Sequence, residues 1–364
     1  MSEKIKVYLQ YPWGRSDSQY YKSMIRDPPE NIEYVQKKIK VGMISNNKKF
    51  FISNFLKSQV RKWTAKLGLI IPNAHYTKDA EKYNLVHCAH CLSKNRNVPW
   101  VADVESLWQM WVSGRNKKGA REKVLKYLKR DNCKKLIAWN EFTANNVANK
   151  FPEVKDKIEI VYYAMSEQKQ IKKKSKDIVL FFSGRHFIFK GGLHATEVID
   201  RLTKKYGNVR GVINGAIPNE IVKKYSGNKK LKFHQLMPYR DILKIYQQAD
   251  IFVYPGYSDS FGFVFMDAMA FGVPIITVDN GGCRREIVED GKNGFVIDIA
   301  RNVDLNNSDE EIISKFCEKT SLLIEDESLR NTMSKAGLKN ISDGKFSLKR
   351  RNGKLNKIYK EAVK

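Results

Sequence analysis

Short apolar runs alternate with amphipathic stretches along this chain of 364 residues. Residues 4–10 alternate apolar and polar side chains as a half-buried strand does, and weaker strand patterns follow. These further patterns lie at 40–45, 69–71, 85–88, 98–103, 135–139 and 158–163. Apolar positions three or four residues apart predict helices between them, most clearly at 51–66 and 120–128. Strands that alternate with helices predict a parallel sheet.

The same alternation returns in the second half of the chain, after a polar segment that we interpret as a linker. Strands are predicted there at 178–183, 209–214, 231–234, 251–255, 274–278 and 295–297. A single core stops growing at about 250–300 residues, so two domains are expected in a chain of this length. The boundaries that we predict are 1–165 for the first domain, 166–177 for the linker, 178–345 for the second domain and 346–364 for a basic terminal helix.

The formal net charge is +27, and Lys clusters include those at 116–135 and 345–364. Three interpretations stay open: a solvated Lys-rich surface, attraction to an anionic membrane surface or a phosphate-bearing lipid, and nucleic-acid binding. Each basic residue near an anionic membrane contributes about 1 kcal/mol. No recognition motif for nucleic acid accompanies the charge, so nucleic acid is not an expected partner.

The cysteine content and the apolar runs indicate the compartment. Five cysteines are too few for a disulfide scaffold and favour a reducing environment. No signal peptide is visible at the start, and the longest apolar run, 261–278, is interrupted by Asp267 and Pro274. We therefore expect a soluble, cytoplasmic protein, with peripheral association at the inner membrane face as the membrane option.

The most informative segment runs from Asp259 to Asp267 and reads DSFGFVFMD. It joins the predicted strand 251–255 to a helical segment through a Phe-Gly-Phe turn. Backbone N–H groups at a helix N-terminus favour an anion, and carboxylates accept protons from hydroxyl groups. The pattern therefore indicates a ligand that carries both phosphates and hydroxyls, such as a nucleotide sugar.

This segment resembles the E-x7-E signature of retaining glycosyltransferases with the GT-B fold, in family 4 (glycosyl transferases group 1), with Asp at both acidic positions. The runs 178–192, 233–255 and 272–297 resemble neighbouring elements of that family in the same order. The resemblance is near-continuous over 178–300 and only a pattern over 1–165. It implies an α/β protein with two Rossmann-like domains whose parallel sheets face each other across a cleft. It also implies that the C-terminal helix 346–364 returns to the N-terminal domain.

The activity that the resemblance implies is retaining, metal-independent transfer of a hexosyl unit. The donor would be a UDP- or GDP-linked sugar, and the acceptor a glycan, a lipid or a protein-linked glycan. Two alternatives stay open. The first is a catalytically inactive binder of nucleotide sugars or glycans, because the acidic residues are Asp and a family His is missing. The second is a basic protein of the same fold associated with nucleic acid.

The resemblance also assigns donor contacts. Arg185 and Lys190 would hold the diphosphate, because they follow the strand 178–183 at the end where doubly wound sheets bind ligands. Gly184 would allow close approach of the backbone. Asp259 would contact hydroxyls of the transferred sugar, and Asp267 would hold the ribose. The backbone amides of Phe261, Gly262 and Phe263 would meet phosphate or sugar oxygens.

Two further assignments are less specific. Leu236 and Met237 match the loop that braces the nucleobase in the family, although a core-facing pair is an equal alternative. Gly14 matches one of two glycines near the donor diphosphate. Asp103 and Glu105 stand where many family members carry a His and an acid; either one replaces the polar contact to the sugar, or both are structural.

Two patterns suggest a metal ion and are not adopted. The run HCAHC at 87–91 resembles half of a zinc site, but the chain has no second Cys-x2-Cys. His87 and Cys88 would also point to opposite faces of a strand. The Asp103-Val104-Glu105 triplet resembles the metal motif of the other glycosyltransferase fold, but that fold lacks the paired-domain motifs found here. We therefore predict a site without a metal.

Overall fold

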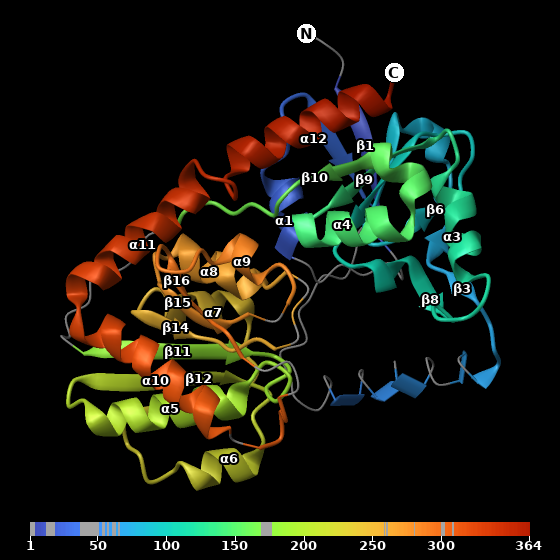
Figure 1. The fold of residues 1–364 in the computed structure, drawn as a ribbon. Coiled ribbons are helices and arrows are strands. Elements are labelled where there is room, and N and C mark those ends of the chain that lie inside the picture. The colour runs from blue at the N-terminus through green and yellow to red at the C-terminus, as the bar shows by residue number, and fades with distance from the viewer. Residues whose placement is uncertain are drawn as a thin grey trace. The chain divides into compact units, whose positions relative to one another are not determined.

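The chain forms two compact units, which are described separately (Figure 1). The computed structural model describes residues 4–11, 19–36, 51–52, 55–56, 58–59, 63–64, 66–168, 177–257, 259, 261–279, 281–299, 303–307 and 309–364. Unit 1 comprises the described residues of Met1–Gly42, Phe51–Ala164 and Leu348–Lys364, and unit 2 those of Met165–Ser347. The predicted strand 40–45 and most of the predicted linker lie outside the described residues.

Unit 1 is built on a parallel sheet of six strands in the order β10-β9-β7-β5-β1-β2. These strands are β1 (Ile5–Gln10), β2 (Ile32–Val35), β5 (Leu85–Cys88), β7 (Trp100–Val104), β9 (Cys133–Ala138) and β10 (Ile158–Ile160). The short strands are β3 (Ile71–Pro72), β4 (Ala74–His75), β6 (Leu92–Ser93) and β8 (Trp111–Ser113). The helices are α1 (Gln19–Arg26), α3 (Ala120–Leu128), α4 (Glu141–Lys150) and α12 (Leu348–Ala362). Trp100, Val124 and Phe151 belong to its buried core.

The C-terminal helix α12 belongs to unit 1, although it is remote from that unit in sequence. Its Arg351 is 2% exposed and donates to the Ser23 hydroxyl at 2.8 Å and to the Asp27 carbonyl at 2.6 Å. The Tyr359 hydroxyl lies 2.6 Å from His87 Nδ1 and 3.0 Å from the Tyr34 hydroxyl. Buried hydrogen bonds therefore fix α12 to two strands and a helix of the unit.

Unit 2 carries a second parallel sheet, in the order β13-β12-β11-β14-β15-β16. Its strands are β11 (Ile178–Gly184), β12 (Val209–Gly215), β13 (Leu231–His234), β14 (Ile251–Val253), β15 (Ile275–Val278) and β16 (Gly294–Ile297). Counted along this sheet, the order is 3-2-1-4-5-6, which is the Rossmann order. Its helices are α5 (Gly192–Lys205), α6 (Asn219–Lys224), α7 (Tyr239–Tyr246), α8 (Phe263–Ala270), α9 (Arg284–Ile287), α10 (Glu310–Glu325) and α11 (Glu327–Ser342).

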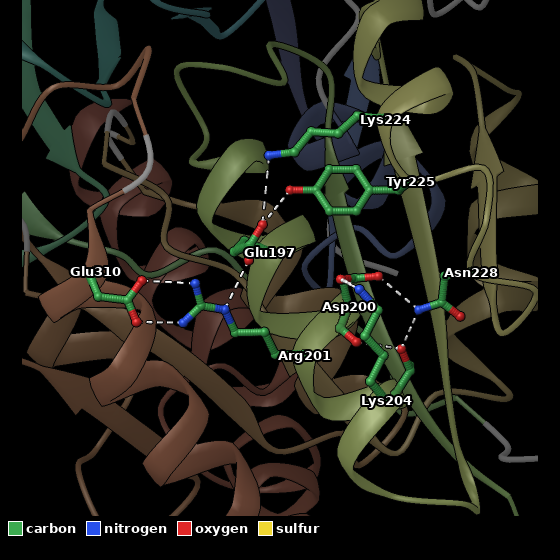
Figure 2. Close-up of polar contacts among 9 residues, drawn as sticks. Glu197, Asp200, Arg201, Lys204, Lys224, Tyr225, Asn228 and Glu310 are labelled. Atoms are coloured by element: carbon green, nitrogen blue, oxygen red, sulfur yellow. Dashed lines mark hydrogen bonds and ion pairs between the residues drawn. The ribbon is translucent and has the colours of Figure 1, made fainter.

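Helix α5 packs on β11 and β12 and is held to its surroundings by a polar network (Figure 2). Arg201 donates to Glu197 on the same helix at 2.9 Å and reaches Glu310 of α10 with two nitrogens. Asp200 accepts from the Asn228 amide at 2.8 Å. These contacts hold the part of α5 from Glu197 to Arg201 to helix α10 and to Asn228.

The hydrophobic pattern located most of these elements. Strands β5 and β13 have the predicted bounds, and helix α3 begins and ends where the spacing predicts. Strand β2 was not predicted.

Candidate functional site

The strand order of unit 2 marks the position at which open α/β sheets bind their ligands. Strand β11 pairs with β12 on one side and with β14 on the other, so the strand order reverses between β11 and β14. Ligands of open α/β sheets bind outside the carboxyl ends of the strands at such a reversal. The loops that follow these two strands carry Lys190 and Asp259, two of the predicted donor contacts.

Lys190 and Asp259 form an ion pair at this point. The Lys190 ammonium donates to Asp259 Oδ1, and the Tyr254 hydroxyl donates to Oδ2 at 2.9 Å. The side chains of Lys190 and Asp259 are 18% and 12% exposed, so both still reach solvent. Burial, together with the Asp259 carboxylate, raises the pKa of Tyr254 well above its ordinary value, which keeps this hydroxyl protonated as a donor.

A second cation, Arg284, approaches the same carboxylate from α9. It is 2% exposed, and its Nη2 donates to the Gly256 carbonyl at 2.8 Å and lies 3.8 Å from Asp259 Oδ2. Its guanidinium carbon lies 4.3 Å from the centre of the Phe265 ring. Its Nε and Nη1 donate no hydrogen bond to any described residue. The sequence analysis did not single out Arg284, whose burial depends on packing against α8.

The two loops are joined closely enough that glycine is required between them. The Gly256 N–H donates to the Lys190 carbonyl at 3.0 Å. Gly191 has φ 76°, and a Cβ added there would lie 2.6 Å from Pro255 Cβ. A Cβ on Gly184, at the end of β11, would lie 2.8 Å from Lys190 Cβ. The glycines therefore let the Lys190 stem and the β14 loop pack against each other.

Asp267 lies inside α8, about one turn beyond its first residue, Phe263. Asp267 is 7% exposed, and its carboxylate accepts a hydrogen bond from the Tyr239 hydroxyl of α7. Burial raises the pKa of Asp267 to about 7, and the Tyr239 hydrogen bond lowers it in part. Asp267 therefore sits near its titration point at neutral pH, unlike an ordinary surface aspartate.

The remaining predicted donor residues lie after β11, around the start of α8, and in the loop between β13 and α7. Arg185, the first residue after β11, is half-buried. Phe261 is buried, and Phe263 is the first residue of α8. Leu236 and Met237 are half-buried in the loop between β13 and α7. This loop leads directly to Tyr239, the partner of Asp267.

In unit 1, the structure separates the roles of the two predicted carboxylates. The Asp103 side chain is fully buried and accepts a hydrogen bond from His87 Nε2 at 2.7 Å. His87 in turn contacts Tyr359 of α12, so Asp103 orients a core histidine and does not reach solvent. This burial argues for the structural alternative at Asp103 and leaves Glu105 as the carboxylate that could contact a ligand.

A histidine lies beside Glu105, although the segment 99–106 contains none. His90, which follows β5, places Nε2 4.0 Å from Glu105 Oε2, and the two side chains are 18% and 20% exposed. The His90 ring packs on Trp139 with centroids 4.7 Å apart. The Gln109 amide also donates to Glu105 at 3.1 Å. Inspection of 99–106 alone could not find His90, because a neighbouring strand supplies it.

The zinc-like run HCAHC does not converge on one point. Both ring nitrogens of His87 have partners within unit 1, and the Cys88 thiol donates to Gln10 Oε1 at 3.2 Å. No three His, Cys, Asp or Glu side chains are grouped as metal ligands in the part of the chain that is described.

Among the described residues there is also no helix long and apolar enough to span a bilayer. Gly14 lies outside the described residues.

Comparison with known sequences supports the resemblance. Residues 165–340 match the family model described as glycosyl transferases group 1. A D-inositol 3-phosphate glycosyltransferase from Corynebacterium efficiens is 31% identical over 133 residues, which cover 33% of this chain and 31% of that protein. The chain spans less than a third of the length of the first curated relatives that it matches.

Solved structures show the fold. A glycosyltransferase from Rickettsia africae has a TM-score of 0.64 at 14% identity and is covered over 100% of both chains. Anabaena HepE in complex with UDP has a TM-score of 0.63 at 14% identity, over 98% of this chain and 100% of that chain. The predicted GT-B fold is thereby confirmed.

Proposed function

We propose that this chain is a retaining glycosyltransferase of family 4 that moves a hexosyl unit from a nucleoside diphosphate sugar to a hydroxyl acceptor. The observation that carries the proposal is the Lys190–Asp259 pair at the strand reversal between β11 and β14. A carboxylate for sugar hydroxyls and a cation for the diphosphate meet there, beside the start of α8. Arg185, which follows β11, supplies a second positive group.

The reaction that we propose depends more on stabilising the negative charge of the leaving diphosphate than on proton transfer by a side chain. The bond between the anomeric carbon and the diphosphate oxygen breaks, and its electron pair leaves with the diphosphate. The acceptor hydroxyl attacks the same face of the sugar and gives its proton to the departing phosphate oxygen. Fixed cations aimed at the growing negative charge lower this barrier. In this proposal Arg185 and Lys190 perform that role, without a metal ion.

Arg284 is a further part of the proposed donor site. Its buried guanidinium leaves Nε and Nη1 without acceptors among the described residues, and buried donors are costly when unsatisfied. Its contact with Gly256 holds the loop that carries Asp259. We assign it as a positioning residue that keeps the Asp259 carboxylate in place when Lys190 turns toward the diphosphate.

The substrates are proposed by analogy. Anabaena HepE was crystallised with UDP, so UDP sugars are the first donors to test and GDP sugars the second. For the acceptor, a glycan, a lipid or a protein-linked glycan remains the proposal. Glu105, with His90 beside it, is the group of unit 1 that we propose as a polar contact to a sugar. An anionic membrane surface is the proposed macromolecular partner, at the cytoplasmic side.

A panel of UDP, GDP and ADP sugars tests this function by thermal shift. A ligand at about 100 times its dissociation constant should stabilise the native state by about 2.7 kcal/mol. Release of nucleoside diphosphate from the sugar that stabilises most should then continue in EDTA. Stabilisation without any release would favour the inactive nucleotide-sugar binder. Loss of activity in EDTA would contradict the metal-independent mechanism.

A further inference from the structure

One oxygen of the buried Asp267 carboxylate has a partner within unit 2. The hydroxyl of Tyr239, on α7, donates to Asp267 Oδ1. Asp267 is 7% exposed and Tyr239 is half-buried, so the pair lies at the boundary between the core and solvent. The contact between the two side chains therefore decides which acceptor atoms this part of the donor site offers to the hydroxyls of a ligand.

The position of Asp267 along α8 suits the ribose of a nucleotide. Asp267 lies four residues after Phe263, the first residue of α8, which corresponds to about 6 Å along the helix axis. In the proposed function, the N–H groups at the start of α8 bind a phosphate of the donor. A ribose joined to that phosphate then reaches the next turn of the helix, where Asp267 and Tyr239 meet.

The start of α7 is anchored on its other side by the loop after β13. Tyr239 is the first residue of α7. In the loop before it, Gln235 Oε1 accepts from the Ile217 N–H at 3.2 Å, and Gln235 Nε2 donates to the Ile217 carbonyl at 3.0 Å. Asn214, which is 2% exposed, donates to the Gln235 carbonyl at 2.9 Å. These hydrogen bonds place Tyr239 independently of its own bond to Asp267.

A tyrosine hydroxyl that donates its proton to a carboxylate is still an acceptor. Tyrosine oxygen both donates and accepts, and donation within a hydrogen-bond chain strengthens the next bond in that chain. The Tyr239 oxygen and the Asp267 carboxylate lie one hydrogen bond apart. Two neighbouring hydroxyls of one sugar ring have a similar separation, so the pair of acceptors is complementary to the two hydroxyls of a ribose.

We propose that Tyr239 binds the ribose of the donor nucleotide: its oxygen accepts one of the two ribose hydroxyls while the Asp267 carboxylate accepts the other. This inference rests on the proposed function, because it requires a nucleoside diphosphate beside the start of α8. Tyr239 was not among the predicted donor contacts, because its place after Pro238 marks only the start of a helix.

A purely structural role for Tyr239 leads to a different expectation. In that case Tyr239 only orients the buried carboxylate, and its loss would weaken the contacts of both ribose hydroxyls alike. If Tyr239 itself binds ribose, its loss removes the contribution of one hydroxyl and leaves that of the other. Nucleotides that lack one hydroxyl at a time therefore distinguish the two roles.

Calorimetric titration with UDP, 2′-deoxy-UDP and 3′-deoxy-UDP tests the proposal, and the same three guanosine nucleotides cover a GDP-linked donor. A buffer at about pH 9 keeps Asp267, whose pKa is about 7, in its charged form. Wild type should bind each deoxy nucleotide about tenfold more weakly than the parent, since each lacks one hydrogen bond. Tyr239→Phe should lose the discrimination against one deoxy nucleotide and keep it against the other.

Asp267→Asn should give the complementary result. The Asn oxygen still accepts from Tyr239, so this variant should keep the discrimination that Tyr239→Phe loses and weaken the other. Tyr246→Phe is the matched control, because the Tyr246 hydroxyl, on the same helix α7, donates to the Val264 carbonyl of α8 at 3.2 Å. It also loses one tyrosine hydrogen bond between α7 and α8, and it should keep both discriminations.

Two results for Tyr239→Phe would overturn the inference. One is discrimination against both deoxy nucleotides as in wild type, and the other is an equal loss of both. Wild-type protein that binds neither UDP nor GDP would overturn the proposed function, and this inference with it. Failure of the Tyr239 assignment alone therefore shows in the variant, and failure of the donor site shows in the wild type.

Discussion

Asp267 is the side chain whose environment departs most from the ordinary among the predicted donor contacts. It is enclosed by α8 and α7, and burial raises its pKa to about 7. Tyr239 donates to it, so one carboxylate oxygen already has a partner. In the proposed function the charged form receives the ribose hydroxyls, because hydrogen bonds to a charged acceptor are the stronger ones.

Donor affinity should therefore increase with pH. Between pH 6 and pH 8 Asp267 passes from mostly protonated to mostly charged, and the affinity for the nucleoside diphosphate should rise across that interval. Calorimetric titration of the nucleotide at several pH values measures this. Asp267→Asn, which has no charge to gain, should show a smaller change. An affinity that is flat in wild type between pH 6 and 8 would remove Asp267 from the ribose site.

Stability should change in the opposite direction. The unfolded chain ionises an Asp near its ordinary pKa of about 3.9, whereas folded Asp267 holds its proton up to about 7. Between these values the native state binds more protons than the unfolded state, so stability falls as pH rises. Asp267→Asn keeps an acceptor for Tyr239 and should lose this part of the pH dependence. Urea unfolding of both proteins at pH 5 and 8 provides the comparison.

Single side chains were predictable from sequence only where a motif marked them. Lys190 and Asp259 were predicted from the resemblance to family motifs, and the structure brings them together as an ion pair. Arg284 was one of 66 Lys and Arg residues, and nothing local indicated that it is 2% exposed. His90 reaches Glu105 only because β5 and β7 pair side by side. Such contacts depend on sheet order, which alternation of side chains does not reveal.

At the level of helices and strands, the turn before α5 joins Lys190 to the first residue of that helix. Gly191 caps this helix with φ 76° and packs against Pro255. Gly119 caps α3 with a similar φ of 79°, but no atom lies within 4 Å of where a Cβ would be. Both glycines need the left-handed backbone conformation. Only Gly191 also has a neighbouring residue, Pro255, where a Cβ atom would lie.

Substitution of the two glycines separates these effects. Gly119→Ala should cost about 1 kcal/mol of folding stability from left-handed backbone strain. Gly191→Ala adds a clash with Pro255 and should cost about 1–3 kcal/mol more, and it should also weaken donor binding. Denaturant unfolding and nucleotide titration on both variants check this. Equal losses in the two variants would show that the contact between the loops contributes nothing.

The bounds of helices and strands followed from the sequence where the hydrophobic pattern was long. Buried parallel strands such as β11 read as continuous apolar runs, and their ends at glycine were visible. Strand β14 proved two residues shorter than the predicted 251–255, because Tyr254 and Pro255 already turn into the loop of Asp259. Proline cannot donate to a sheet ladder, so the strand ends before it.

At the scale of the whole chain, the C-terminal helix α12 packs into unit 1, which otherwise comes from the N-terminal half. Asp103, His87, Tyr359 and Tyr34 form one buried chain of hydrogen bonds that joins β7, β5, α12 and β2. The basic composition of 348–364 predicted a helix, and only the analogy with the family suggested where it packs. Its buried face, which includes Leu355 and Ile358, is not distinguishable from sequence among so many Lys residues.

Tyr359→Phe tests this connection. It leaves His87 Nδ1 buried without its partner, and should lower the free energy of unfolding by about 1–3 kcal/mol. Tyr76→Phe is the control, because Tyr76 is 69% exposed and its change should be within about 0.5 kcal/mol. Urea unfolding followed by fluorescence measures both. Equal stability of the two variants would mean that the buried hydrogen-bond chain does not hold α12.

The turnover number of Lys190→Ala tests the proposed reaction most directly. Lys190 must stabilise a diphosphate whose charge grows as the glycosidic bond breaks, so its loss should affect the transition state more than donor binding. We expect kcat to fall about 10²–10³-fold while donor affinity falls less. Lys229→Ala, at an exposed lysine of the same unit, should keep wild-type kcat. A folded Lys190→Ala variant that turns over at the wild-type rate would contradict the assigned role of this cation.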